Sequence, residues 1–118
     1  MSATTAVADL LTAAHAELAA CGLHQGGHLH EATGAVDIAG ALRLAADCPP
    51  NELPGSAYVL GVLLAAEDAL ALHLGIDPTA ADAGEAVAAW CDQPGRTLAQ
   101  ALDLLAVTAG VIMPGRAA

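Results

Sequence analysis

Apolar residues return along most of this sequence at the three- and four-residue spacing that marks one face of a helix. In the first segment this spacing begins at Thr4 or Thr5 and continues to about Cys21, where Gly22 provides a helix stop. The same spacing recurs in four later segments, which cover residues 39–46, 56–74, 78–91 and 98–111. The sequence therefore predicts five helices.

Capping signals indicate where two of these helices begin. Asp77 followed by Pro78 has the order of an N-cap and a first helical residue, so we expect the fourth helix to start there and reach Trp90 or Cys91. Thr97 and Gln100 have the spacing of a capping box, which places the start of the last helix at residue 98.

The scarcity of aromatic residues narrows the fold class further. Hydrophobic residues make up 56% of the chain, yet it contains no Phe, one Trp and one Tyr, so Ala, Leu and Val must fill the core. Alanine is the strongest helix former and is depleted in strands, which favours a mainly α protein. A length of 118 residues fits one domain, 1–118, with one hydrophobic core.

Residues 28–38, "HLHEATGAVDI", interrupt the helical pattern with alternating polar and apolar residues around Thr33-Gly34. Alternation around such a pair predicts a small β-hairpin after the first helix. A two-stranded ribbon is not stable alone, so the hairpin should lie against the helices. The predicted architecture is a compact five-helix domain with this hairpin inserted.

The register of the hairpin decides which polar side chains meet. A two-residue loop would pair His30 with Asp37 and His28 with Ala39, whereas a three-residue loop would put His30 opposite Val36 and turn Asp37 away. The sequence leaves both registers open.

The charge balance excludes two classes of partner. The formal net charge is −10 and the three basic side chains are arginines, so we expect no binding to nucleic acid or to an anionic membrane. The longest apolar run, residues 57–66, is too short to cross a membrane. Three cysteines without a C-x-x-C pair, behind an N-terminus that lacks signal-peptide features, predict a cytoplasmic protein.

Three segments carry a family resemblance: "GLHQG" (22–26), "GAVDIAGAL" (34–42) and "AAWCDQPGRT" (88–97). In order and spacing they resemble an uncharacterised family of small actinobacterial proteins with the pattern G-W-x-Q-G, G-x-x-C-x-x-G-A and A-W-N-D-x-P-G-R-T. The chain departs from this pattern at Leu23 (Trp in the pattern), Asp37 (Cys) and Cys91 (Asn). The resemblance implies a shared fold, and the departures indicate either a new chemical purpose or neutral drift.

The predicted hairpin contains the first candidate catalytic groups. His28 and His30 share one strand face, with His24 nearby and Asp37 opposite in one register, which suits acid–base catalysis. Such a set could alternatively ligate zinc or iron, or could be a solvated surface. We predict no metal.

Asp37 is the preferred acid–base group, because burial beneath the helices would favour the protonated form that a general acid requires. The alternative is that Asp37 serves as the N-cap of the helix that follows.

Glu67 is the second candidate carboxylate, since it falls in the apolar seam of the most hydrophobic helix, between Leu63 and Leu70. Carboxylates are rarely buried without a partner. Either the helix rotates to expose Glu67 together with Asp68, or Glu67 reaches into a cavity as an acid–base group.

Four more side chains are candidates for substrate binding, although each also has a structural interpretation. His15 borders the core stripe of the first helix, Trp90 is the expected core anchor of the fourth, and Tyr58 would need a hydroxyl partner if buried. His24 completes the set.

These observations predict a small cofactor-free enzyme that uses acid–base side chains on a small apolar molecule, as a cyclase, an isomerase or an epoxide-opening enzyme, an activity that would fit secondary metabolism. The sequence contains no glycine-rich phosphate loop, no G-x-S-x-G and no H-E-x-x-H motif, so we expect no cofactor. The alternative is a non-catalytic helical module that binds a small ligand or a protein. The excess of apolar residues favours a homodimer in either case.

Overall fold

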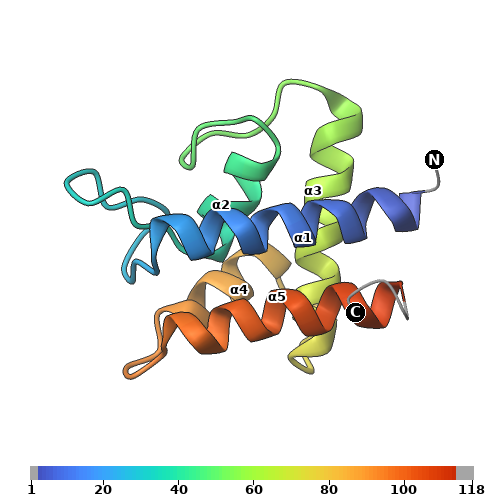
Figure 1. The fold of residues 1–118 in the computed structure, drawn as a ribbon. Coiled ribbons are helices and arrows are strands. Elements are labelled where there is room, and N and C mark those ends of the chain that lie inside the picture. Colours follow the sequence, from blue (N-terminus) through green and yellow to red (C-terminus); the bar gives the residue numbers. More distant parts are fainter. Residues whose placement is uncertain (1–2, 114–118) are drawn as a thin grey trace.

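The computed structural model describes residues 3–113, which form a mainly helical protein with the five helices that the sequence predicts (Figure 1). The helices are α1 (Ala3–Cys21), α2 (Ile38–Ala45), α3 (Ala57–His73), α4 (Ala83–Cys91) and α5 (Leu98–Ile112). Ser56 caps α3, and the capping box of Thr97 and Gln100 opens α5 as expected. Among the described residues, no helix combines the length and the apolar character needed to cross a membrane.

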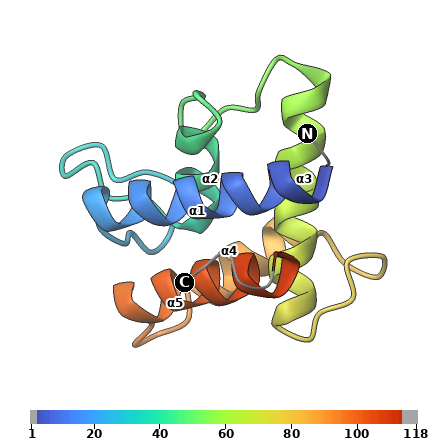
Figure 2. The same cartoon turned by 45° about the vertical axis from the view of Figure 1, so that its right-hand side comes forward.

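Two long helices and one crossing helix organise the fold. α1 and α5 run alongside each other in opposite directions, and α3 crosses both at a steep angle (Figures 1 and 2). The short helices α2 and α4 contact each other and α3. This arrangement leaves α2, α3 and α4 to frame one side of the molecule.

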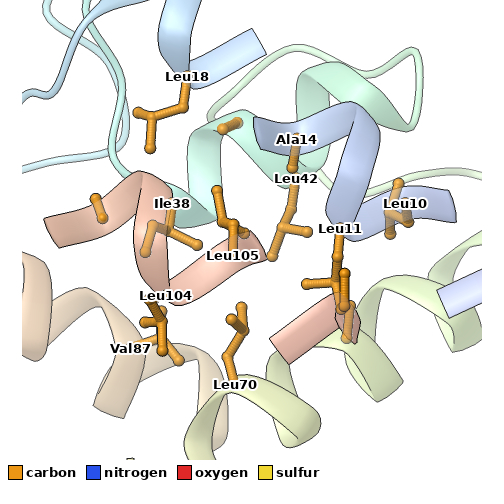
Figure 3. Packing of buried hydrophobic residues seen from close by; sticks show 14 of the residues in the cluster. Leu10, Leu11, Ala14, Leu18, Ile38, Leu42, Leu70, Val87, Leu104 and Leu105 are labelled. Atoms are coloured by element: carbon orange, nitrogen blue, oxygen red, sulfur yellow. The ribbon is translucent and has the colours of Figure 1, made fainter. Parts of the chain in front are cut away.

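All five helices contribute to one core. Small and medium aliphatic side chains fill it, as the lack of aromatic residues requires (Figure 3). Its largest fully buried aliphatic members are Leu11, Leu18, Val36, Ile38, Leu42, Leu63, Leu70, Val87 and Leu105. Burial of each such side chain contributes about 1.5–3 kcal/mol relative to exposure, so the core fixes the helix arrangement. Trp90 is partly buried and packs against the edge of this cluster, so the central contact of α4 comes from Val87 rather than from Trp90.

The predicted β-hairpin is not formed. In the described chain, the segment between α1 and α2 has two isolated bridges, both to Val36: a parallel one from Leu23 and an antiparallel one from Leu29. Leu23 and Leu29 thus each pair with Val36, but neither pairing extends into a strand.

The antiparallel bridge fixes a register that differs from both expected ones. With Leu29 opposite Val36, His28 faces Asp37 and His30 faces Ala35, whose carbonyl oxygen accepts from the His30 amide at 2.8 Å. The Gly34 amide donates to the His30 carbonyl at 2.8 Å, and Gly34 has a positive φ of 79°, so a four-residue loop closes here. His28 therefore takes the place that the two-residue loop gave to His30.

The start of α4 also differs from the prediction. Asp77 does not begin the helix; its Oδ1 accepts from the backbone amide (2.9 Å) and hydroxyl (2.7 Å) of Thr79 and closes a local turn. The helix begins at Ala83, where Asp82 is the N-cap and accepts from the Glu85 amide at 3.0 Å. Either aspartate could cap a helix by its chemistry. Asp82 is the N-cap because a helix that begins after it packs against α3.

Candidate functional site

A cleft of about 540 Å³ opens on the side framed by α2, α3 and α4. Its apolar lining includes small side chains of α2 and α4 and two leucines: Ala39, Ala88, Ala89, Leu53 and Leu64. Its ionisable lining consists of His28, Arg43, Glu67, Asp82, Glu85 and Asp92. Two of the four predicted catalytic residues, His28 and Glu67, thus share one cleft.

Asp37 lies directly behind His28. The Nδ1 atom of His28 is 3.0 Å from Oδ2 and 3.1 Å from Oδ1 of Asp37, and Asp37 is only 1% exposed. Oδ1 of Asp37 also accepts from the Gly40 amide at 2.8 Å, which makes Asp37 the N-cap of α2. The expected N-cap role and a role beside histidine therefore coexist. Asp37 is a partner of His28 and is not itself part of the cleft lining.

The close approach of α2 to the preceding segment holds this pair in place. A Cβ atom at Gly40 would overlap the backbone carbonyl oxygen of His28 and lie 3.1 Å from Cβ of Val36. The backbone of Val36 is fixed in turn, because its amide donates to Gly22 at 2.9 Å and its carbonyl accepts from His24 at 2.8 Å. Only glycine at position 40 lets His28 reach Asp37 in this way.

The loop that carries His28 is tied to the end of α4 and the turn that follows it. Gln25 Nε2 donates to the carbonyl oxygens of Cys91 (2.9 Å) and Gln93 (2.7 Å), and the Gly26 amide donates to Oδ1 of Asp92 at 2.8 Å. Together with the backbone bonds of Val36 to Gly22 and His24, these bonds join the three segments that carry the family resemblance. The resemblance pattern thus coincides with the frame of the cleft.

Glu67 reaches into the cleft from α3 and is only 4% exposed, whereas its neighbour Asp68 is exposed. Its Oε2 is 3.8 Å from Nη1 of Arg43. Burial raises the pKa of Glu67 above its usual value; the positive charges of Arg43 and His28 oppose this effect, and the charge of Asp82 adds to it. Of the two expected arrangements, the structure shows the one in which Glu67 enters a cavity.

Gly84 gives Glu67 this space. A Cβ atom at Gly84 would lie 2.9 Å from Oε2 and 3.1 Å from both Cδ and Oε1 of Glu67, so α4 approaches the carboxyl group at its one glycine. The buried carboxyl group is therefore held between α3 and α4.

The other predicted residues lie outside the cleft lining. His30 is exposed, hydrogen-bonds within its own turn to Thr33, and has its ring 5.1 Å from that of His24, at an interplanar angle of 71°. Tyr58 is 63% exposed and lines a separate groove of about 380 Å³ beside α1. His15 is half-buried on α1, a helix that contributes no described residue to the cleft.

Trp90 stacks under a cation. The guanidinium carbon of Arg96 lies 3.9 Å from the centroid of the Trp90 ring, and Arg96 Nε donates to the Trp90 carbonyl at 2.9 Å. This pair braces the turn between α4 and α5, so the interpretation of Trp90 as a structural residue fits better than substrate binding.

Four ionisable residues of the cleft were missed by the sequence analysis: Arg43, Asp82, Glu85 and Asp92. The sequence does single out Arg43, because it is the only charged residue in the apolar sequence of α2. Within residues 3–113, no group of three or more His, Cys, Asp or Glu side chains is arranged to hold a metal ion.

The fold and the site define a small helical protein whose cleft is lined by a buried glutamate and by a histidine that a buried aspartate supports from behind. The chain belongs to a family of unknown function, DUF6197, whose model matches residues 2–111. This match confirms the membership in an uncharacterised family that the resemblance indicates. Searches of the curated proteins and of the solved structures give no significant match.

Proposed function

We propose that the cleft is the active site of a cofactor-independent enzyme that moves protons to and from a small, mainly apolar substrate. The observation that carries this proposal is the presence in one cleft of an imidazole backed by the buried Asp37 and of the buried Glu67. A buried carboxyl group close to a histidine that is itself backed by a carboxylate is typical of catalytic sites.

His28 is suited to act as the base. When Nδ1 donates its hydrogen to Asp37, the neutral ring keeps its lone pair on Nε2, the nitrogen that remains for the cleft. Asp37 thereby fixes the tautomer and supports the imidazolium that forms when Nε2 accepts a proton, as the orienting carboxylate does in hydrolytic triads.

Glu67 is suited to act as the acid. Its raised pKa keeps a larger share of the carboxyl group protonated near neutral pH, as a general acid requires. It can then give that proton to an oxygen of the substrate as a C–O bond breaks.

Epoxide opening illustrates how the two groups would work together. His28 takes a proton from water while the water oxygen bonds to one epoxide carbon, and the C–O bond of that carbon breaks as Glu67 protonates the ring oxygen. The product is a diol, and transfer of the proton from His28 back to Glu67 restores the site. A hydroxyl group of the substrate in place of water would give a cyclisation, and removal of a proton from carbon would give an isomerisation.

The apolar lining supports the substrate class. Five aliphatic side chains line a volume of about 540 Å³, which suits a small molecule rather than a macromolecule. We further propose a cytoplasmic homodimer, because the three cysteines are free thiols and large apolar side chains such as Leu72 and Val111 are exposed.

The test is turnover of a panel of small cyclic and terpenoid epoxides, followed by the diol product. We expect His28→Asn and Glu67→Gln each to lower the rate by about 10²–10⁴-fold. His73→Asn and Glu31→Gln make the same chemical changes on exposed side chains that do not line the cleft, and should leave the rate unchanged. Turnover that survives both cleft substitutions would contradict the proposal. Binding of panel members without turnover would favour the binding-module alternative.

A further inference from the structure

Arg43 is an unusual residue in this cleft. It is the only lysine or arginine among the described lining residues, in a chain with a formal net charge of −10. Its side chain is 13% exposed, so the guanidinium group is largely shielded from solvent within the cleft.

The guanidinium group keeps donors free for a ligand. Within the described chain, the side chain of Arg43 makes one hydrogen bond, from Nη1 to the carbonyl oxygen of Ala39 at 2.9 Å. Its 3.8 Å separation from Glu67 is too long for a hydrogen bond. Because a guanidinium carries five N–H donors, most of its donors remain available.

The surrounding charges select the kind of ligand that these donors can take. Three carboxylates, Asp82, Glu85 and Asp92, are exposed members of the same lining and disfavour an anionic substrate. Arg43 itself disfavours a cation beside it. An uncharged oxygen avoids both penalties and accepts hydrogen bonds from a guanidinium.

We propose that Arg43 and Glu67 together bind the reacting oxygen of the substrate, and that the substrate is an uncharged epoxide or carbonyl compound with an apolar body. Negative charge grows on that oxygen as its bond to carbon breaks or as the carbonyl becomes an enolate. Arg43 stabilises this charge while Glu67 supplies the proton, so Arg43 joins the catalytic residues of the cleft. This inference rests on the proposed function and adds to it a residue that stabilises charge and the uncharged oxygen that this residue binds.

The experiment measures binding of three probes that share one apolar skeleton: cyclohexanecarboxamide, cyclohexanecarboxylate and cyclohexylmethylammonium. NMR titration of the whole chain at pH 7 gives each Kd, and the Nε–H resonance of Arg43 reports direct contact in the unmodified protein. We expect the amide to bind at least 10-fold more tightly than either ion and to shift the Arg43 resonance.

Substitution then tests the residue. Arg43→Met should weaken amide binding by about 10- to 100-fold, the loss expected for hydrogen bonds from a charged donor. Arg96→Met makes the same change on the arginine stacked on Trp90 and should leave amide binding intact. Arg43→Lys keeps the charge without the planar fork and should give an intermediate Kd, which also serves if the Met variant does not fold.

Tighter binding of either ion, amide binding that ignores Arg43, or no binding of the amide would each overturn the inference. The proposed function is tested separately, by the loss of epoxide turnover in His28→Asn and Glu67→Gln. Epoxide turnover that depends on His28 and Glu67, with amide binding indifferent to Arg43, would leave the acid–base enzyme and remove the proposed role of Arg43.

Discussion

Gly40 offers the most direct test of how the site is held together. It lies in the first turn of α2, where an added Cβ would overlap the carbonyl oxygen of His28 and lie 3.1 Å from Cβ of Val36. One of these neighbours is backbone and the other is a fully buried β-branched side chain, so neither can rotate away. Gly40→Ala must therefore displace the segment that carries His28.

The magnitude follows from two opposing effects. Alanine in a helix gains about 0.5–1 kcal/mol over glycine, whereas overpacking a buried contact costs about 1–3 kcal/mol. We expect a net fall of about 1–2 kcal/mol in the free energy of unfolding. For a chain of this length, about 4 °C of Tm corresponds to each kcal/mol, so the fall in Tm should be roughly 4–8 °C.

Gly61 supplies the matched control, because it lies within α3, is exposed, and has no atom within 4 Å of an added Cβ. Gly61→Ala should therefore gain about 0.5–1 kcal/mol and raise Tm by roughly 2–4 °C. Thermal unfolding followed by circular dichroism measures both variants, and epoxide turnover should fall in Gly40→Ala alone. Equal stabilisation of the two variants would refute the close approach of α2 to His28.

The remaining predictions concern ionisable side chains. Burial raises the pKa of Glu67, so the folded state holds this proton more tightly than the unfolded chain and loses stability as the pH rises from about 4.5 through the folded pKa. Glu67→Gln should therefore be more stable relative to the wild type at pH 7 than at pH 4 in urea unfolding, and an equal difference at both pH values would contradict the burial. Burial also raises the pKa of the Cys91 thiol to about 12, so a thiol reagent at pH 8 should modify the half-buried Cys21 first and Cys91 only on unfolding, as peptide mass spectrometry can show. His30→Asn should keep full turnover where His28→Asn loses it, and the reverse pattern would restore the register with His30 opposite Asp37.

Local sequence signals determined the helices and several of their ends. The apolar spacing of α1, α3 and α5, the stop at Gly22 and the capping box of Thr97 and Gln100 all depend on residues within about four positions of one another. Apolar spacing also marked Glu67 as exceptional, because a carboxylate is rarely buried in an apolar seam without a partner. These features were predictable since helix geometry and capping are local.

Contacts between distant segments decided how the site is assembled. Gln25 bonds to Cys91, 66 positions away, and Gly40 admits the backbone of His28, so the register that selects His28 over His30 comes from tertiary packing. The same packing makes Asp82, and not Asp77, the N-cap of α4. A ribbon of a few residues allows several registers of similar local energy. The sequence alone therefore determined which residues could carry chemistry, whereas the packing of α2 and α4 around the loop decided which of them meet.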